Sequence, residues 1–397
     1  MASRPTVAVL AFSPIRRDAR VLRQISYLSE HFRLIVIGYG PLESVPSGVE
    51  YHAVAPPQGL GLGRKARSLL YLPLGRLLPA WAYESWYWQR FDRQIFLSLL
   101  NETQPDFIHA NDWHALPVAV RAMQRSRAHI ILDLHEYAPL QYARCSYHGL
   151  FFNSMADYFI RTYSAQATAT VTVSRSIAEK YRQVYGLDPQ VVMNAPTYNP
   201  AIKLVPTDAQ HIRLVHHGAA RPARRLDLLI RTMAHTDSRY TLHFLLINST
   251  SAYVSKLKSL AQRIAPTKVF FHPAVRPQAI VSRISEFDMG FYLLPPICFN
   301  QAAALPNKFF DFIAAGLAVC IGPSPEMARM IGQYGFGVVA ADFTPYAAAQ
   351  ALNALSTADV NDMKTVAIEC HQTLNADVEM ARLVDLYMDL TQKKGSR

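Results

Sequence analysis

The chain has 397 residues, of which half are hydrophobic, and a formal net charge of +11. This length is more than one hydrophobic core usually serves, so two domains are predicted, and the hydrophobic content excludes a disordered protein. The positive charge indicates polyanionic partners, namely nucleotides, nucleic acid or acidic lipid, without choosing among them.

Cysteine usage and the N-terminal sequence predict a cytoplasmic protein. The four cysteines are scattered without metal-ligand spacing, which favours buried thiols in a reducing compartment: Cys145, Cys298, Cys320 and Cys370. The first residues lack the layout of a signal peptide, and no apolar run is long enough to span a membrane. We therefore expect no metal and no transmembrane helix.

In the first half, short apolar runs alternate with amphipathic stretches. Asp18 is expected to cap a helix through Leu28 whose apolar face holds Val21, Leu22, Ile25 and Leu28. The alternation predicts a parallel sheet with right-handed crossovers. Its strands are expected at 7–12, 34–37, 107–110, 130–134, 169–174 and 191–196.

Residues 60–96 interleave arginines with leucines, tyrosines and tryptophans. This composition suits an element that lies on an anionic membrane surface. Two alternatives remain: the aromatic side chains pack inside the domain, or they bind single-stranded nucleic acid, for which no accompanying motif is present. A glycine run at Gly59, Gly61 and Gly63 is a weak phosphate-loop candidate, and no G-x-G-x-x-G dinucleotide motif follows the first strand.

Two polar loops follow neighbouring strands of this half. One contains His109, Asn111 and Asp112, and the other contains His135 and Glu136. The carboxyl ends of parallel strands line the crevice where α/β proteins bind ligands. A histidine in such a loop can donate to a substrate hydroxyl or to developing negative charge, although a single histidine is more often structural.

The second half repeats the pattern after a proline-broken linker at 195–210. Strands are expected at 212–218, 242–247, 269–271 and 287–293, with helices at 226–233 and about 360–390. A basic loop follows the first of these strands and contains Arg221, Arg224 and Arg225. Such a loop is suited to clamp a diphosphate, or it is simply solvated.

The stretch 305–321 predicts a turn, a short helix ending near Gly316 and a buried strand. Lys308 and Asp311 lie on the first turns of this helix, at the mouth of a parallel sheet. One cation and one carboxylate there suit a nucleotide, Lys308 for its diphosphate and Asp311 for its ribose hydroxyls. The alternative is an ordinary amphipathic helix with both charges in water.

Together these motifs resemble the GT-B glycosyltransferases of family 4 (glycosyl transferases group 1) over nearly the whole chain. The resemblance rests on H-A-N-D-W-H-A-L-P at 109–117, D-L-H-E at 133–136, V-S at 173–174, N-A-P at 194–196 and P-N-K-F-F-D with A-A-G at 306–316. It implies an α/β fold of two Rossmann-like domains facing across a cleft. The expected domains are 1–199, completed by a returning C-terminal helix at 372–397, and 207–371.

The resemblance also assigns residue roles. Catalytic positions are His135, near the reacting centre of the donor sugar, and Asp112. The donor-binding positions are Gly218, Arg221, Arg224, Leu305, Asn307, Lys308 and Asp311, and the acceptor side of the cleft has Arg16, Asn111 and Glu136. One family acid is replaced by Ala303, and the expected arginine near Ala219 is missing, with Arg221 as its substitute.

The predicted function is transfer of a sugar from a nucleoside-diphosphate donor to an acceptor hydroxyl, with retention and without a metal or other cofactor. The acceptor is expected to be a cell-surface glycan or a lipid-linked sugar, and the protein to sit in the cytoplasm or on the inner face of the membrane. Nucleic acid is not an expected partner. The alternatives are a sugar-nucleotide epimerase or hydrolase, and an inactive scaffold subunit favoured by Ala303.

Overall fold

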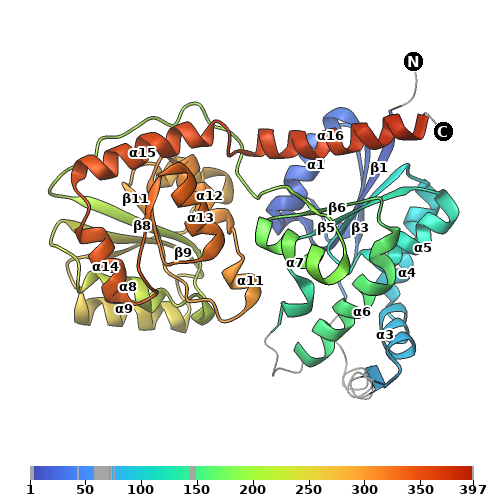
Figure 1. Ribbon diagram of the computed structural model, residues 1–397, viewed down its shortest axis with the longest axis horizontal. Helices are drawn as coiled ribbons and strands as arrows, with labels where there is room; N and C mark the ends of the chain where they lie inside the picture. The colour runs from blue at the N-terminus through green and yellow to red at the C-terminus, as the bar shows by residue number, and fades with distance from the viewer. Residues whose placement is uncertain are drawn as a thin grey trace. The chain divides into compact units, whose positions relative to one another are not determined.

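The computed structural model describes residues 4–42, 44–57, 71, 74–75, 77–142 and 149–395. They form two compact units (Figure 1). The first comprises Met1–Met193, Cys298–Asn300 and Met380–Arg397, and the second comprises Asn194–Ile297 and Gln301–Glu379. The glycine run at 59–63, Cys145 and most of the segment 60–76 lie outside the described residues.

The first unit contains a seven-stranded parallel sheet in the order β3-β2-β1-β4-β5-β6-β7. Its strands are β1 (Thr6–Pro14), β2 (Arg33–Tyr39), β3 (Val49–Val54), β4 (Phe107–Asn111), β5 (His129–Leu134), β6 (Ala169–Thr172) and β7 (Gln190–Val191). Strand order reverses between β1 and β4, and ligands of such sheets bind outside the carboxyl ends at this point.

Helices cover both faces of this sheet (Figure 1). The first and last helices of the chain share one core with the sheet: Val21, Ile25 and Leu28 pack with Leu383 and Tyr387. The helices of this unit are η1 (Ile15–Arg17), α1 (Ala19–His31), α3 (Pro79–Trp88), α4 (Phe91–Thr103), α5 (Leu116–Ser126), η2 (Ala138–Leu140), η3 (Gly149–Asn153), α6 (Ser154–Tyr163), η4 (Ser164–Gln166), α7 (Arg175–Tyr185) and α16 (Ala376–Gly395).

Helix α1 has a buried face different from the expected one. Asp18 caps it as predicted, with its side chain accepting from the Val21 amide. Leu22, however, is 37 % exposed, whereas Arg20 and Gln24 are buried at 5 % and 0 %. The sequence hydropathy is misleading here because the sheet offers a buried carboxylate to both polar side chains.

The second unit contains a six-stranded parallel sheet in the order β10-β9-β8-β11-β12-β13. Its strands are β8 (Ile212–Ala219), β9 (Tyr240–Ile247), β10 (Val269–His272), β11 (Met289–Tyr292), β12 (Ala318–Ile321) and β13 (Gly337–Val339). The order reverses between β8 and β11. The carboxyl ends of these two strands therefore mark the expected ligand position of this unit.

The helices of the second unit are η5 (Pro222–Arg224), α8 (Leu226–Met233), α9 (Ala252–Ile264), η6 (Pro277–Ala279), α10 (Ile280–Ile284), α11 (Phe299–Ala302), α12 (Asn307–Ala314), α13 (Pro325–Tyr334), α14 (Pro345–Asn353) and α15 (Thr357–His371). Phe299 and Asn300 of α11 group with the first unit. Helix α12 packs unusually close to β11. A Cβ on Gly290 would lie 2.2 Å from the Phe312 ring, so only glycine fits there.

A buried ion pair anchors α15 to the second sheet. Lys364 Nζ lies 3.1 Å from Asp288 Oδ1 and donates to the Val205 carbonyl at 2.6 Å. The other carboxylate oxygen of Asp288 accepts from the Arg213 amide at 2.8 Å. A buried charge is tolerated only when it is paired in this way.

The predicted fold class, two Rossmann-like parallel-sheet units with a helical C-terminal tail, is confirmed. Two local expectations differ. The last strand of the first half, β7, has two residues, because 192–196 leaves the sheet. The helical region predicted at 360–390 is two helices, α15 and α16, separated by 372–375, where Asn375 caps the second through its contact with the Val378 amide.

Candidate functional site

Two groups of polar side chains lie at strand ends, one in each unit. In the first unit, Asn111 and Asp133 are directly paired in register across β4 and β5. His135 follows β5, and its Nε2 lies 3.0 Å from Asn111 Oδ1. The Asp112 amide donates to the Asp133 carbonyl at 2.7 Å, and Asp112 has a left-handed φ of 67°. The two predicted polar loops are therefore adjacent.

The centre of this first group is Asp133, whose side chain has no exposed surface. Arg20 contacts both carboxylate oxygens, with Nε at 2.7 Å from Oδ2 and Nη2 at 2.8 Å from Oδ1. Gln24 donates to Oδ2 at 2.6 Å. Burial alone would raise the pKa of Asp133, but the Arg20 charge and the nearby imidazoles hold it well below its usual value.

Two histidines approach the same carboxylate. His109 and His135 each place Nε2 3.5 Å from Asp133 Oδ2. His109 is fully buried, burial lowers its pKa, and its Nδ1 lies 2.8 Å from the Tyr387 hydroxyl of α16. His109 is thus a neutral part of the packing between the sheet and the last helix.

His135 is the histidine that remains accessible, with its side chain 23 % exposed. Burial works to lower its pKa, but the Asp133 carboxylate offsets this, and the pKa of His135 lies above its usual value. The neighbours of Nε2 are oxygen acceptors, so Nε2 carries a proton and a substrate would meet Nδ1. A positively biased imidazole at a strand end is suited to stabilise developing negative charge.

The other residues predicted for this side are arranged differently. Burial raises the pKa of Asp112, whose carboxylate accepts from the Trp113 amide at 2.9 Å. Glu136 and Arg16 are exposed. The Arg16 side chain makes no hydrogen bond or ion pair with the residues that the structure describes.

Sequence analysis missed Arg20, Gln24 and Tyr387. Arg20, Gln24 and Leu28 recur at every fourth position, next to the apolar face of α1, and this spacing could have marked two polar side chains directed into the sheet. Nothing in the sequence pairs Tyr387 with His109, because 278 positions separate them.

In the second unit, the central side chain is Lys308 on the first turn of α12. Its Nζ lies 2.9 Å from His216 Nε2. His216 Nδ1 lies 2.9 Å from the Phe291 carbonyl, which can only accept, so Nε2 is the unprotonated nitrogen and accepts from the lysine. The Lys308 ammonium also lies 5.2 Å from the centre of the Tyr292 ring.

Positive charge exceeds negative charge around this lysine. Burial and the nearby Arg224 guanidinium lower the pKa of Lys308 to about 7, while Asp311 acts in the opposite direction. Arg224 also bonds the Tyr292 hydroxyl. Burial and the neighbouring guanidinium disfavour the charged form of Lys308. An anion bound there would stabilise both cations.

The remaining predicted donor residues lie around the end of β8 and in or just before α12. Gly218 is the last residue but one of β8 and has φ 109°, and a Cβ there would lie 3.7 Å from Lys308 Nζ. Asp311 Oδ2 lies 3.5 Å from His217 Nε2, and burial lowers the pKa of His217 to about 3. Leu305 is buried, whereas Asn307 and Arg221 are exposed.

His216, His217 and Tyr292 were not predicted, although the first two end a strand as His109 and His135 do. Applying the same strand-end argument to 216–217 would have found them. Ala303, where the family has an acid, is 2 % exposed. Among the residues that the structure describes, no group of three or more histidine, cysteine or acidic side chains is placed to hold a metal ion.

Comparison with known proteins shows which class of proteins shares this fold. Residues 44–195 match the model of the family Glycosyltransferase Family 4. No curated protein sequence matches the chain.

Solved structures match almost the whole chain. Sucrose-phosphate synthase from Thermosynechococcus elongatus aligns with a TM-score of 0.73 at 13 % identity, covering 98 % of this chain and 100 % of the other. Anabaena HepE in complex with UDP-glucose gives 0.67 at 14 %, covering 97 % and 100 %. WaaG, a glycosyltransferase involved in lipopolysaccharide biosynthesis, gives 0.63 at 14 %, covering 96 % and 99 %. The chain has the GT-B fold of glycosyltransferases, and the predicted resemblance is confirmed.

The Asp133 charge predicts a specific change in His135. In Asp133→Asn the pKa of His135 should fall by about one pH unit, because the opposite charge 3.5 Å away is lost. An NMR titration of the His135 ring measures this directly. Glu136→Gln, which removes an exposed neighbouring carboxylate, should leave the titration nearly unchanged. Equal shifts in both variants would contradict the role given to Asp133.

Proposed function

We propose that this protein transfers a sugar from a nucleoside-diphosphate donor to an acceptor hydroxyl. The observation that carries the proposal is the excess positive charge of Lys308 and Arg224 at the strand-order reversal of the second sheet. A diphosphate would neutralise both cations, and the Lys308 turn of α12 adds backbone N–H groups directed at an anion. Asp311, one turn further along, suits the ribose hydroxyls.

The chemistry follows from charge. As the bond between the sugar and the phosphate breaks, its electron pair goes to the departing diphosphate, and positive charge builds on the anomeric carbon. Lys308 and Arg224 stabilise the departing group, so the proposed reaction does not call on a metal. The acceptor oxygen forms the new bond to the anomeric carbon and passes its proton to the oxygen of the departing diphosphate. We propose retention of the anomeric configuration because of the motif resemblance. The NMR coupling constant of the product's anomeric proton tests it.

By the motif resemblance, His135 is assigned to the donor sugar, where its Nδ1–H, present when the imidazole is protonated, can donate to a sugar oxygen. The Asp133 carboxylate raises the pKa of His135 and so favours its protonated form. A hydrogen bond from this ring strengthens as negative charge develops on the oxygen that accepts it. The acceptor is proposed to be a cell-surface glycan or a glycolipid. The solved neighbours bound to UDP or UDP-glucose make UDP-sugars the first donors to test.

Replacing His135 tests the assignment. With a UDP-sugar that the protein turns over, His135→Ala should lower kcat for transfer by about 100-fold, while UDP affinity changes little. Calorimetry measures UDP binding, and release of UDP with and without acceptor measures turnover. Release without acceptor in the parent protein would make it a hydrolase or epimerase. Binding without any turnover would make it a scaffold, and full activity of His135→Ala would remove the assignment.

The pKa of Lys308 predicts how UDP binding depends on pH. The free lysine titrates near pH 7, and a bound diphosphate would hold it protonated and raise its pKa. UDP affinity should therefore be steady below pH 7 and fall above it, by up to tenfold per pH unit. In Lys308→Arg the guanidinium stays charged above pH 7, so the fall in UDP affinity should disappear in this variant. UDP itself titrates in the same way with both proteins, so the comparison removes that contribution. Identical pH profiles would contradict the proposal.

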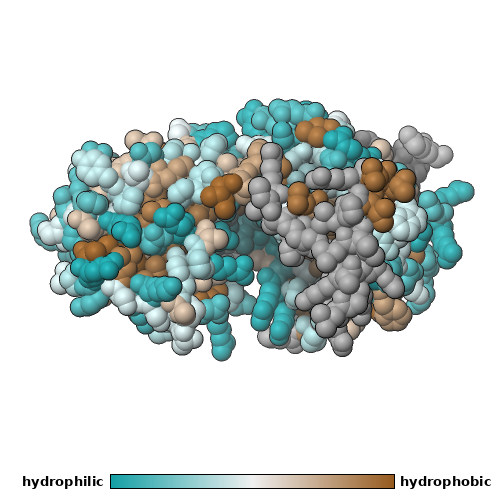
Figure 2. All heavy atoms as spheres, turned by 90° about the horizontal axis from the view of Figure 1, so that it is seen from below, coloured by the Kyte–Doolittle hydropathy of each residue, from teal (hydrophilic) through white to brown (hydrophobic). Residues whose placement is uncertain are grey.

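We also propose association with an anionic membrane surface through the described part of 60–96. Leu77, Leu78 and Trp81 are 77 %, 58 % and 56 % exposed, and apolar surface is visible on the first unit in Figure 2. Several other described residues of this segment pack inward. Trp86 and Tyr87 are buried, and the Arg93 guanidinium lies 3.7 Å from the Phe12 ring and forms an ion pair with Asp92.

No helix in the described ranges is long and apolar enough to cross a bilayer, so contact would be at the surface. The parent protein should bind vesicles containing phosphatidylglycerol at low salt. Replacing Leu77, Leu78 and Trp81 by serine should weaken binding by about tenfold, because their apolar area is no longer inserted. Tyr346→Ser, an exposed aromatic of the second unit, is the matched control. Equal binding by both variants would rule out this surface.

A further inference from the structure

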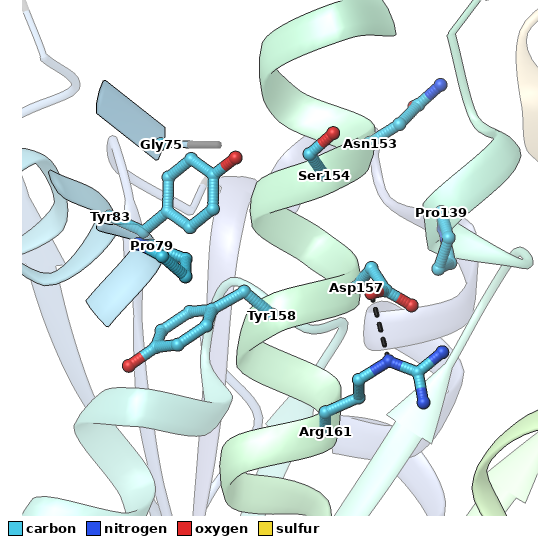
Figure 3. Close-up of a pocket in the computed structure, with 9 residues that line it drawn as sticks. All are labelled: Gly75, Pro79, Tyr83, Pro139, Asn153, Ser154, Asp157, Tyr158 and Arg161. Atoms are coloured by element: carbon cyan, nitrogen blue, oxygen red, sulfur yellow. Dashed lines mark hydrogen bonds and ion pairs between the residues drawn. The ribbon is translucent and has the colours of Figure 1, made fainter. Parts of the chain in front are cut away.

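The first unit has a cavity whose lining includes no residue of the Asp133 group. It has a volume of about 580 Å³ and is bordered by α3 and α6. Figure 3 shows the rings of Tyr83 and Tyr158 on one side of α6, and the Asp157–Arg161 pair with Pro139 on the other. We refer to this cavity, which crosses α6, as the α6 trough.

The two sides of the α6 trough offer different contacts. The ring centres of Tyr83 and Tyr158 are 5.6 Å apart, and because Tyr83 is buried, the half-buried Tyr158 ring supplies the aromatic wall. Opposite this wall, Asp157 Oδ2 lies 3.0 Å from Arg161 Nε. These two charged side chains are 38 % and 55 % exposed, so both present polar atoms to solvent. The pair is neutral overall.

This combination selects among ligand classes. An acyl chain needs a continuous apolar lining, which the ion pair interrupts. A phosphate needs uncompensated cations, and Asp157 already balances Arg161. Sugar rings have apolar C–H faces that pack on aromatic rings, and they have hydroxyls that both donate and accept. A carboxylate beside a guanidinium provides an acceptor and donors for such hydroxyls.

The chain connects the α6 trough to the strand-end histidine. Pro139 forms one wall and lies on η2, four residues after His135. Four residues span at most about 14 Å when fully extended. The side of the α6 trough that Pro139 forms therefore lies within a few sugar rings of His135, and both belong to the first unit.

We propose that the α6 trough binds neutral sugar residues of the acceptor glycan, behind the residue that receives the transferred sugar. This inference rests on the proposed function and specifies its acceptor as a glycan longer than one sugar. Tyr158 packs against a ring face, and Asp157 and Arg161 bind hydroxyls. Longer acceptors should accordingly bind more tightly than their terminal sugar alone.

Sugar binding to the full-length protein tests this without requiring turnover. The probes are linear tetrasaccharides of glucose, galactose, mannose and N-acetylglucosamine, with the matching monosaccharides, observed by saturation-transfer NMR. At least one tetrasaccharide should bind about tenfold more tightly than its monosaccharide. Tyr158→Ala and Arg161→Ala should each remove this gain, whereas Tyr158→Phe, which keeps the ring, should retain most of it.

Controls separate this inference from the proposed function. Arg182→Ala, at an exposed arginine of α7, should bind like the parent protein, and thermal unfolding checks that the variants are folded. Lys308→Ala should lose UDP binding and keep the tetrasaccharide signal. No tetrasaccharide binding, or binding indifferent to Tyr158→Ala and Arg161→Ala, would overturn the α6 trough. Tetrasaccharide binding without UDP binding would overturn the donor site alone.

Discussion

A carboxylate with no contact to water, Asp133, constrains the architecture of the first unit. A charge in this position costs several kcal/mol unless its oxygens are bonded and its charge is balanced. Arg20 and Gln24 from α1 meet that need, and so α1 must lie against the end of β5. The position of the first helix, the polarity of its buried face and the charge state of His135 are consequences of one requirement.

The second unit shows the opposite balance. Lys308 and Arg224 lie close together, with Asp311 as partial compensation, and the lysine pKa falls to about 7. Close packing of Phe312 on Gly290 brings the α12 turn to the strand ends, which fixes Lys308 beside His216. In the first unit the buried carboxylate is thus neutralised by a side chain of the same unit. In the second unit the positive charge of Lys308 and Arg224 is only partly compensated.

The sequence predicted what depends on local pattern. Apolar runs and proline or glycine breaks identified most strands, and the helix at 226–233 matched its bounds. A strand-end motif pointed to His135, and a helix-start motif pointed to Lys308 and Asp311. The sequence failed where a distant partner decides. From the sequence alone Arg20 is expected to face solvent and Leu22 to be buried, but the ion pair of Arg20 with Asp133 reverses the two. Arg93, within the predicted membrane segment, packs on Phe12 and pairs with Asp92 instead. His216 needed no distant information and was a missed local signal.

The hydroxyl of Tyr387 reaches His109 from α16, which follows the whole second unit in the chain. The last helix therefore supplies part of the core and hydrogen bonding of the first unit. During translation, the face of the first sheet that α16 covers would stay uncovered until the second unit had been synthesised. The order of translation would then leave His109 without its Tyr387 hydrogen bond until the whole second unit had been made.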